Sequence, residues 1–328
     1  MFGEFWSLLS IGIGLGAVYA IGAVGLALIV RFTGILHFAH GAVFVLASYV
    51  LLANSGTAAL GFTVPAALVT SGVAGWLVYE AVYRPLERRA IPVLGFVIAS
   101  FGVLIVAENA MTLGFGSTAR AVPWPNELAS GTVRLGSATI RVADLVATAL
   151  ALIAIGALAW YRRRTRTGLL LRALERNKRL AADLGISYRR YAPVIFVIGS
   201  LLAGVAAVLS SFTVPIAPEG GLQWTVSVYI AMAVGGTGSI WSAAVGGLAL
   251  GILSTVPDLW IAGSWNTALA FGVVVVMLLV MPNGLVPGRD TERGGTSPAV
   301  ALLRRLANLP GGAALSGETS LSGQDRKQ

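Results

Sequence analysis

Long apolar runs alternate with short polar segments along most of the chain. The runs that approach or exceed the length of a membrane-spanning helix lie at 8–30, 38–53, 58–79, 93–113, 145–160 and 192–212. A helix needs about 20 apolar residues to cross a bilayer, whereas the strands of a membrane barrel have about ten residues of alternating character. The pattern therefore predicts an all-α integral membrane protein, a polytopic bundle of about 8–9 transmembrane helices.

The C-terminal third has a different pattern. Two shorter apolar segments, 226–234 and 243–256, flank a break rich in glycine, and a last span is expected at 268–281. Interrupted helices are tolerated at membrane depth where protein or a cavity satisfies the backbone, so we expect broken or short helices here. After Pro282 the chain becomes polar and rich in Gly and Ser. We therefore expect a transmembrane domain over 1–282 and a disordered tail over 283–328.

Composition agrees with a membrane protein and excludes several other classes. Hydrophobic residues make up 56% of the chain and charged residues 11%, against about 25% charged residues in a typical soluble domain. The chain has no cysteine, which excludes a disulfide framework and a thiolate metal site. A net charge of +9 could suggest a nucleic-acid partner, but the basic residues follow the loops between the apolar runs.

The basic residues are distributed unequally between alternate loops. Of the 23 Lys and Arg residues, 20 lie in loops that would face one side of the membrane, and ten of these lie between 161 and 190. The other side receives only Arg120, Arg134 and Arg141. Because Lys and Arg loops stay cytoplasmic, we expect the loop 161–190 and the C-terminus inside the cell, and the N-terminus and the loop 115–141 on the periplasmic side.

The basic loop also has an apolar pattern. Leucines and alanines recur at roughly helical spacing among its charges, which predicts a short amphipathic helix ending near Gly185. Such a helix either lies against anionic headgroups or docks onto a soluble partner. We favour the partner.

Two histidines lie near the start of the second apolar run. His37 and His40 are three residues apart, but a metal site needs further ligands, and the chain has no other His or Cys to provide them. We expect a structural role near the membrane interface, with the ring nitrogens bonded to neighbouring backbone, in preference to direct contact with a substrate.

Glu108 and the glycine-rich break are the other candidates. A carboxylate inside a span is costly and often functional, although Glu108 lies close enough to a polar loop that an interfacial, hydrogen-bonded role is favoured. The segment Gly235 to Ser239 resembles a phosphate loop but has no following Lys, so helix packing is favoured over a place along a transport path. No catalytic grouping and no nucleotide motif occurs in the sequence, so we expect neither an enzyme nor a cofactor bound by this chain.

Several motifs together indicate a family. They are Gly16-Ala17-Val18-Tyr19-Ala20, Phe38-Ala39-His40-Gly41, Tyr83-Arg84-Pro85-Leu86, Leu184-Gly185-Ile186, Gly235-Gly236 with Gly238-Ser239, and Met281-Pro282 with Gly284-Leu285. In this order the chain resembles the inner-membrane permease subunits of bacterial branched-chain amino-acid ABC importers, of the type with an Asn-Phe-Ala-His-Gly motif, here HFAHG. The resemblance covers nearly all of 12–288.

The resemblance implies a multi-pass protein of the bacterial inner membrane that works with a second permease subunit in a heterodimer, two cytoplasmic ATPases that use ATP, and a periplasmic substrate-binding protein. The basic loop would contain the helix that couples to an ATPase. Its expected coupling residues are Arg172, Glu175, Asn177, Ala181, Gly185 and Ile186. Expected substrate-path residues are His37, His40, Gly41, Glu108, Gly235, Gly236, Gly238 and Ser239.

The sequence departs from the family pattern at His37, where Asn is usual, and at Arg176, where an acid is usual. Two alternatives stay open. An ABC permease of this kind can carry urea or short amides, and an ion-coupled secondary transporter would need an acid deep in the bilayer, for which Glu108 is the candidate.

Overall fold

We describe the protein from a computed structural model, which defines residues 2–55, 60–125, 128, 130–135, 138–236, 239–259 and 272. The first half contains α1 (Phe2–Thr33), α2 (Ala39–Asn54), α3 (Leu60–Leu77), the π-helix η1 (Val78–Tyr83), α4 (Arg84–Arg88) and α5 (Val93–Phe115). The second half contains α7 (Val142–Arg164), α8 (Arg166–Arg176), α9 (Lys178–Asp183), α10 (Tyr188–Ser210), α11 (Gly220–Gly235), α12 (Ile240–Leu253) and the 3-10 turn η2 (Val256–Leu259). The all-α expectation is confirmed.

Among the described residues, five helices are long and apolar enough to cross a membrane. They cover Gly3–Thr33, Gly61–Arg88, Val93–Phe115, Val142–Arg164 and Tyr188–Ser210, and the bent pair α11 and α12 makes a sixth if counted as one span. The expected span 38–53 is the helix α2, whose 16 residues extend about 24 Å, less than the roughly 30 Å of a bilayer core. The expected span 268–281 and the tail 283–328 lie outside the described residues, apart from residue 272.

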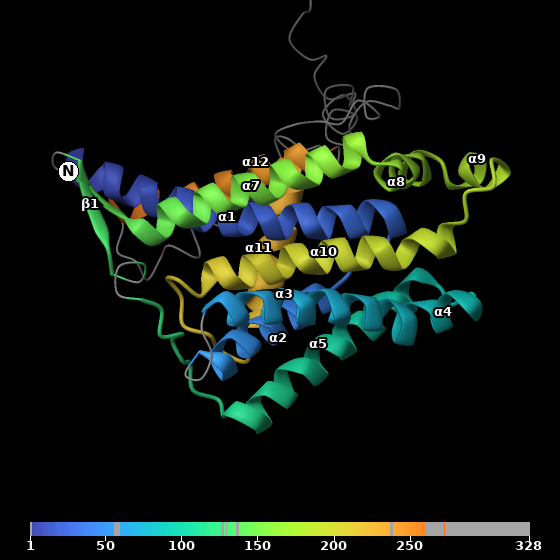
Figure 1. Ribbon diagram of the computed structural model, residues 1–328, viewed down its shortest axis with the longest axis horizontal. Coiled ribbons are helices and arrows are strands. Elements are labelled where there is room, and N and C mark those ends of the chain that lie inside the picture. Colours follow the sequence, from blue (N-terminus) through green and yellow to red (C-terminus); the bar gives the residue numbers. More distant parts are fainter. Residues whose placement is uncertain are drawn as a thin grey trace, which may run out of the picture.

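The longest helices lie side by side around α1. Figure 1 shows α1 and α7 running from the hairpin end to the opposite end and α10 running back antiparallel to them, with α3 next to α10. On its other side α1 packs against α12 through small residues: a β-carbon built on Gly251 would overlap the backbone of Gly16, and one on Gly247 would overlap that of Ala20. Small residues let membrane helices approach closely, which explains the tight seam between α1 and α12.

The helix α11 crosses this bundle instead of following it (Figure 1). It begins beside α2, passes α1 and ends against α12, to which it is bent by 116°. Gly235 closes the corner, because a β-carbon there would overlap the carbonyl of Ser242. The predicted break is therefore confirmed, and packing accounts for Gly235. Gly238 lies outside the described residues.

The two ends of the bundle carry different structures (Figure 1). One end holds the N-terminal part of α1 and a hairpin of two antiparallel strands, β1 (Thr132–Leu135) and β2 (Ala138–Arg141), within the segment expected only as a polar connection. The opposite end holds α4, α8 and α9. Here the expectation of a single amphipathic helix is wrong: the basic loop forms two helices that meet at Asn177, whose side chain caps α9 by accepting a hydrogen bond from the backbone of Leu180 (3.0 Å).

Candidate functional site

The start of α2 lies deep inside the bundle. The chain turns back after α1 at Gly34, whose φ of +80° is in the left-handed region that favours glycine. Residues 34–38 then re-enter the bundle, so that a β-carbon built on Gly25 of α1 would lie 3.4 Å from Cε1 of His40. Gly25 is eight residues before the end of α1, which places the His40 ring about 12 Å inside that end. His40 is therefore buried within the bundle, about two turns inside the end of α1.

Side chains from distant elements satisfy the backbone of this re-entrant segment. The N–H of His37 donates to the hydroxyl of Tyr229 on α11, and the N–H of Phe38 donates to Oγ of Ser100 on α5 at 3.2 Å. Such partners are needed because water does not reach unpaired backbone groups at this depth. Side chains of α5 and α11 thus hold the segment 34–38, which leads into α2.

The imidazole of His37 is also held by a side chain. Its Nδ1 lies 2.8 Å from the hydroxyl of Tyr83 in η1, and both His37 and His40 are fully buried. The expectation of backbone partners near the interface is wrong for His37 Nδ1. Nε2 of His37 has no hydrogen-bond partner among the described residues, and the same holds for the indole nitrogen of Trp224. These two buried polar atoms make the cluster a candidate binding site for a polar solute.

Aromatic rings connect the histidines to a cavity. His40 stacks on Trp224 of α11 with ring centroids 5.5 Å apart, and Trp224 stacks on Phe44 of α2 at 4.1 Å. Phe44 and Trp224 border a cavity of about 330 Å³, which is lined further by Leu15, Val18, Tyr19, Val45, Ser48, Ala207, Ser210, Ser211, Val214, Pro215, Ile216, Ala217, Gly220, Gln223 and Ser227. Along α1 the Trp224 ring lies at Gly22, between the cavity-lining Tyr19 and Gly25, which faces His40, so the ring stands between the cavity and His40.

Glu108 stands at the beginning of α11. Its Oε1 accepts a hydrogen bond from the backbone N–H of Leu222 at 2.8 Å, within the first turn of that helix. The hydrogen-bonded interpretation is confirmed, because the carboxylate satisfies an unpaired N–H and faces the positive end of the helix dipole. Gly41 packs nearby, where a β-carbon would overlap Thr225 of α11. Both residues fix how α11 crosses α2 and α5.

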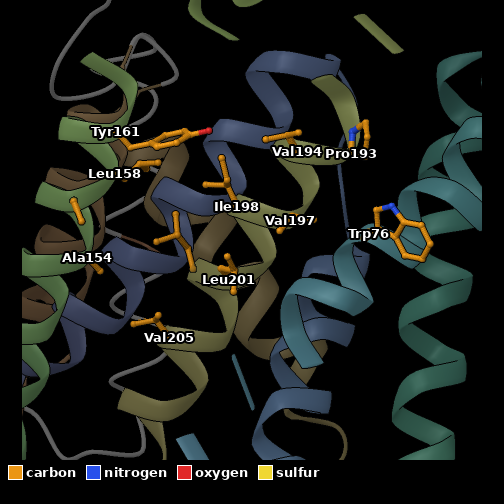
Figure 2. Close-up of a pocket in the computed structure, with 12 residues that line it drawn as sticks. Trp76, Ala154, Leu158, Tyr161, Pro193, Val194, Val197, Ile198, Leu201 and Val205 are labelled. Carbon is orange, nitrogen blue, oxygen red and sulfur yellow. The ribbon is translucent and has the colours of Figure 1, made fainter. Parts of the chain in front are cut away.

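A larger groove between α7 and α10 has a different character. It measures about 610 Å³, and Figure 2 shows Leu158 and Tyr161 lining it from α7, with Ile198 and Leu201 on α10. Its lining has polar side-chain atoms only on Trp76 and Tyr161, whereas the Trp224 cavity is lined by the hydroxyls of several serines and by the amide of Gln223. We therefore place the candidate solute site at the Trp224 cavity.

The basic loop is anchored to the bundle by an ion pair. Both terminal guanidinium nitrogens of Arg162, at the end of α7, donate to the carboxylate of Glu175 on α8 at 2.6 and 2.7 Å. The two side chains are only 10% and 5% exposed. The carboxylate of Glu175 thus holds α8 against α7. Its expected contact with an ATPase stays a prediction.

The remaining expected coupling residues shape α9. Gly185 has a φ of +79°, and the N–H groups of Gly185 and Ile186 donate to the carbonyls of Ala182 and Ala181 at 2.9 Å, which is the Schellman arrangement that ends a helix. Ala181 is buried. The exposed apolar residues of this region are instead Leu180 (57% exposed) and Leu184 (72% exposed), and Leu180 was not singled out in the sequence.

A second set of contacts links α9 to the membrane helices. The carboxylate of Glu87 in α4 accepts hydrogen bonds from Tyr188 (3.1 Å) and from Tyr79 in η1 (3.2 Å). Lys178 of α9 donates to the carbonyl of Thr33 at 3.2 Å and lies over the ring of Tyr188. Desolvation lowers the pKa of Lys178, and the negative charge of Glu87 opposes this shift. These contacts join α9, through Tyr188 of α10, to Glu87 of α4 and Tyr79 of η1.

In this multi-pass helical protein, a half-length helix and a crossing helix meet at buried polar groups. A solute-sized cavity lies beside them. This construction is typical of membrane transport proteins. Residues 8–281 match the family described as branched-chain amino acid transport system / permease component, and the chain belongs to this family. It is a transport subunit of the ABC type.

Relatives of this chain carry consistent names. It is 30% identical to the high-affinity branched-chain amino acid transport system permease protein LivH of Escherichia coli, over 86% of this chain and 95% of the relative. It is 28% identical to BraD of Pseudomonas aeruginosa, a permease protein of the same transport system, with the same coverage of both chains. The probable branched-chain amino acid permease LivH of Methanocaldococcus jannaschii is 27% identical over 80% of this chain and 85% of the relative.

Proposed function

We propose that this chain is the permease subunit of an ABC importer that moves branched-chain or related hydrophobic amino acids across the inner membrane. The observation that carries the proposal is the meeting of α2 and α11 beside the Trp224 cavity, in a chain whose relatives are named as branched-chain amino acid permeases. Two cytoplasmic ATPases, which bind and hydrolyse ATP, a second permease subunit and a periplasmic binding protein would complete the importer.

The lining of the cavity suits such a solute. Val18, Phe44 and Ile216 offer apolar surface for an aliphatic side chain. The hydroxyl oxygen of Ser48 can accept from the ammonium, and the side-chain amide of Gln223 can donate to the carboxylate. No acidic or basic side chain lines the cavity among the described residues, so the zwitterion would be held by neutral groups. This arrangement favours a small hydrophobic amino acid over a charged one.

The two ends of the bundle support an orientation. The end with α4, α8 and α9 carries most of the basic residues, and positively charged loops stay in the cytoplasm. On our proposal the hairpin end faces the periplasm, where a binding protein would deliver the solute, and α9 faces the ATPases. The cavity lies between the hairpin end and the His40 ring, which Trp224 separates from it.

The coupling route follows the contacts of α9. Closure of the ATPases would displace α8 and α9, and the Arg162–Glu175 pair would pass the displacement of α8 to α7. Tyr188 and Glu87 would pass the motion to η1, and Tyr83 at the end of η1 bonds His37. The region around His37 and Trp224 would then switch access from one side to the other.

Reconstitution tests the function directly. The full chain is placed in liposomes with its second permease subunit, the ATPases and the binding protein, and uptake of radiolabelled leucine is measured with and without ATP. We expect ATP-dependent accumulation by the assembly and none by the chain alone. Accumulation without ATPases would exclude an ABC mechanism, and ATP-dependent uptake of urea but not of leucine would assign the cargo to short amides.

Replacing Leu184 with aspartate tests the docking surface. Leu184 is exposed and apolar, so a charge there should weaken binding to the ATPase without disturbing the fold. We expect association with the ATPase, measured by pull-down, and leucine uptake to fall together by about tenfold or more. The matched control is Leu169→Asp, an exposed leucine on α8 (59% exposed) that lies before the Asn177 break. Equal losses in both variants would contradict docking through α9.

Replacing Glu108 with glutamine distinguishes the ABC importer from a proton-coupled carrier. The amide oxygen still accepts a hydrogen bond from Leu222, so we expect leucine uptake to remain within about threefold of the wild type. Alanine removes the cap and should lower the stability of α11 by about 0.5–2 kcal/mol. Abolished uptake in the glutamine variant, with ATPase activity intact, would favour proton coupling.

A further inference from the structure

A small pocket at the α8 end of the bundle is lined by arginines. It has a volume of about 170 Å³ and lies between the end of α1, the end of α7, α8 and the start of α12. Its lining includes four arginines from three helices, Arg31, Arg162, Arg163 and Arg172. None of the described residues in its lining is acidic, so the pocket is positively charged, as a binding site for an anion would be.

The pairing of these arginines leaves positive charge in the pocket. Arg162 is neutralised by Glu175, which binds both of its terminal nitrogens. Arg172 makes no hydrogen bond or ion pair within the part of the chain that the structure describes, and its Nε is buried. A buried donor without an acceptor costs about 1–3 kcal/mol. An anion in the pocket would remove this cost.

The start of α12 adds backbone donors. Ser239 and Ser242 form a capping box and satisfy each other's N–H groups, whereas Ile240 and Trp241, which also line the pocket, lie in the first turn, where N–H groups have no partner within the helix. Helix N-termini attract anions because unpaired N–H groups and the dipole act together. Arginine forks and helix N–H groups are the usual partners of phosphate oxygens.

The depth of the pocket indicates where the phosphate comes from. Arg31 and Arg163 lie in the last turns of two membrane-spanning helices, which is the level of lipid headgroups. Trp160 and Trp241 are 64% and 51% exposed nearby, as expected for residues at a membrane interface. Basic pockets between membrane helices on the cytoplasmic side are known to hold anionic headgroups.

We propose that this arginine pocket binds a phosphate group, supplied by the headgroup of an anionic phospholipid in the cytoplasmic leaflet. The lipid would bridge α1, α7, α8 and α12 beside the helices that carry the coupling surface. The site is separate from the Trp224 cavity, and its occupancy does not depend on which solute is transported.

The test measures lipid bound to the full chain by native mass spectrometry. The protein is purified in detergent with phosphatidylcholine and titrated with phosphatidylglycerol. We expect one phosphatidylglycerol to be retained at concentrations where phosphatidylcholine is not. Arg172→Gln and Arg163→Gln should each weaken that retention about tenfold, because each removes a charged donor. The matched control is Arg176→Gln, which removes the same charge from an exposed position of α8 outside the pocket and should change retention less than twofold.

The variants and a second anion complete the test. Arg163 is exposed, so its variant reports on the pocket even if Arg172→Gln fails to fold, and Arg172→Lys should keep part of the binding because it keeps the charge. Displacement of phosphatidylglycerol by inorganic phosphate would support recognition of the phosphate group. Binding of inorganic phosphate alone, with no lipid adduct, would support the same pocket with a free anion as its source. Equal losses in Arg163→Gln, Arg172→Gln and Arg176→Gln would overturn the proposal, since general surface charge would then explain retention.

Discussion

Replacing Glu175 with alanine is expected to release the basic loop from the membrane helices. The change leaves the guanidinium of Arg162, 9% exposed, without its carboxylate partner. Removing one member of a buried ion pair costs about 3–5 kcal/mol, much of it the penalty of an unpaired buried charge. Because the pair joins α7 to α8, we expect this cost to appear as local opening of α8 and α9.

Limited proteolysis measures this opening. Trypsin cleaves after Arg and Lys, and the segment 161–190 contains ten such residues, so the opened loop should be cut much faster than in the wild type. ATP-dependent leucine uptake should be lost in the same variant. The matched control is Glu80→Ala, which removes the partner of Arg84 in an exposed pair (42% and 24% exposed) and should cost less than about 1 kcal/mol.

A double variant separates the charge from the packing. Arg162→Leu with Glu175→Leu removes both charges and fills the same space with apolar groups, which is often close to neutral for stability. We expect it to restore resistance to trypsin that Glu175→Ala alone lacks, giving a coupling energy between the two positions. Similar cleavage of the wild type and Glu175→Ala would show that the ion pair does not hold the loop.

The apolar pattern predicted the helices well but not their depth. The run 38–53 has the composition of a span, yet α2 begins inside the bundle because Ser100 and Tyr229 satisfy the backbone before it. Tyr229 lies 192 residues from His37. Hydropathy indicates that a segment is buried. It does not indicate which distant side chains provide hydrogen bonds to the backbone N–H groups of that segment.

The basic loop shows a related limit. Among the apolar residues that recur at helical spacing in this loop, Leu171, Leu174 and Ala181 are buried, whereas Leu184 is exposed, and Gly185 ends a helix as expected. The sequence did not indicate that Asn177 would divide the loop into two helices. Asn is tolerated in a helix and is also a good N-cap, so its role here depends on how α8 packs on α7.

Replacing Trp224 with alanine is expected to remove the barrier between the solute cavity and His40. Trp224 is 6% exposed and fills the space between the rings of Phe44 and His40. Truncating a buried aromatic side chain costs about 3–5 kcal/mol and leaves a void where it stood. Alternating access requires that the cavity be closed toward one side while it is open to the other. We therefore expect ATP hydrolysis to continue while leucine accumulation falls by about tenfold or more, because solute leaks back through the void.

The measurement compares hydrolysis and accumulation in the same liposomes, and counterflow of preloaded leucine reports the leak. Trp224→Phe is the matched control for the seal, because phenylalanine can still stack on Phe44. Its counterflow should stay close to the wild-type level, whatever the loss of the indole N–H does to the affinity for the solute. Size-exclusion profiles show whether the alanine variant is folded. A folded Trp224→Ala that accumulates leucine normally would place the barrier elsewhere, since the ring would then be dispensable for sealing the cavity.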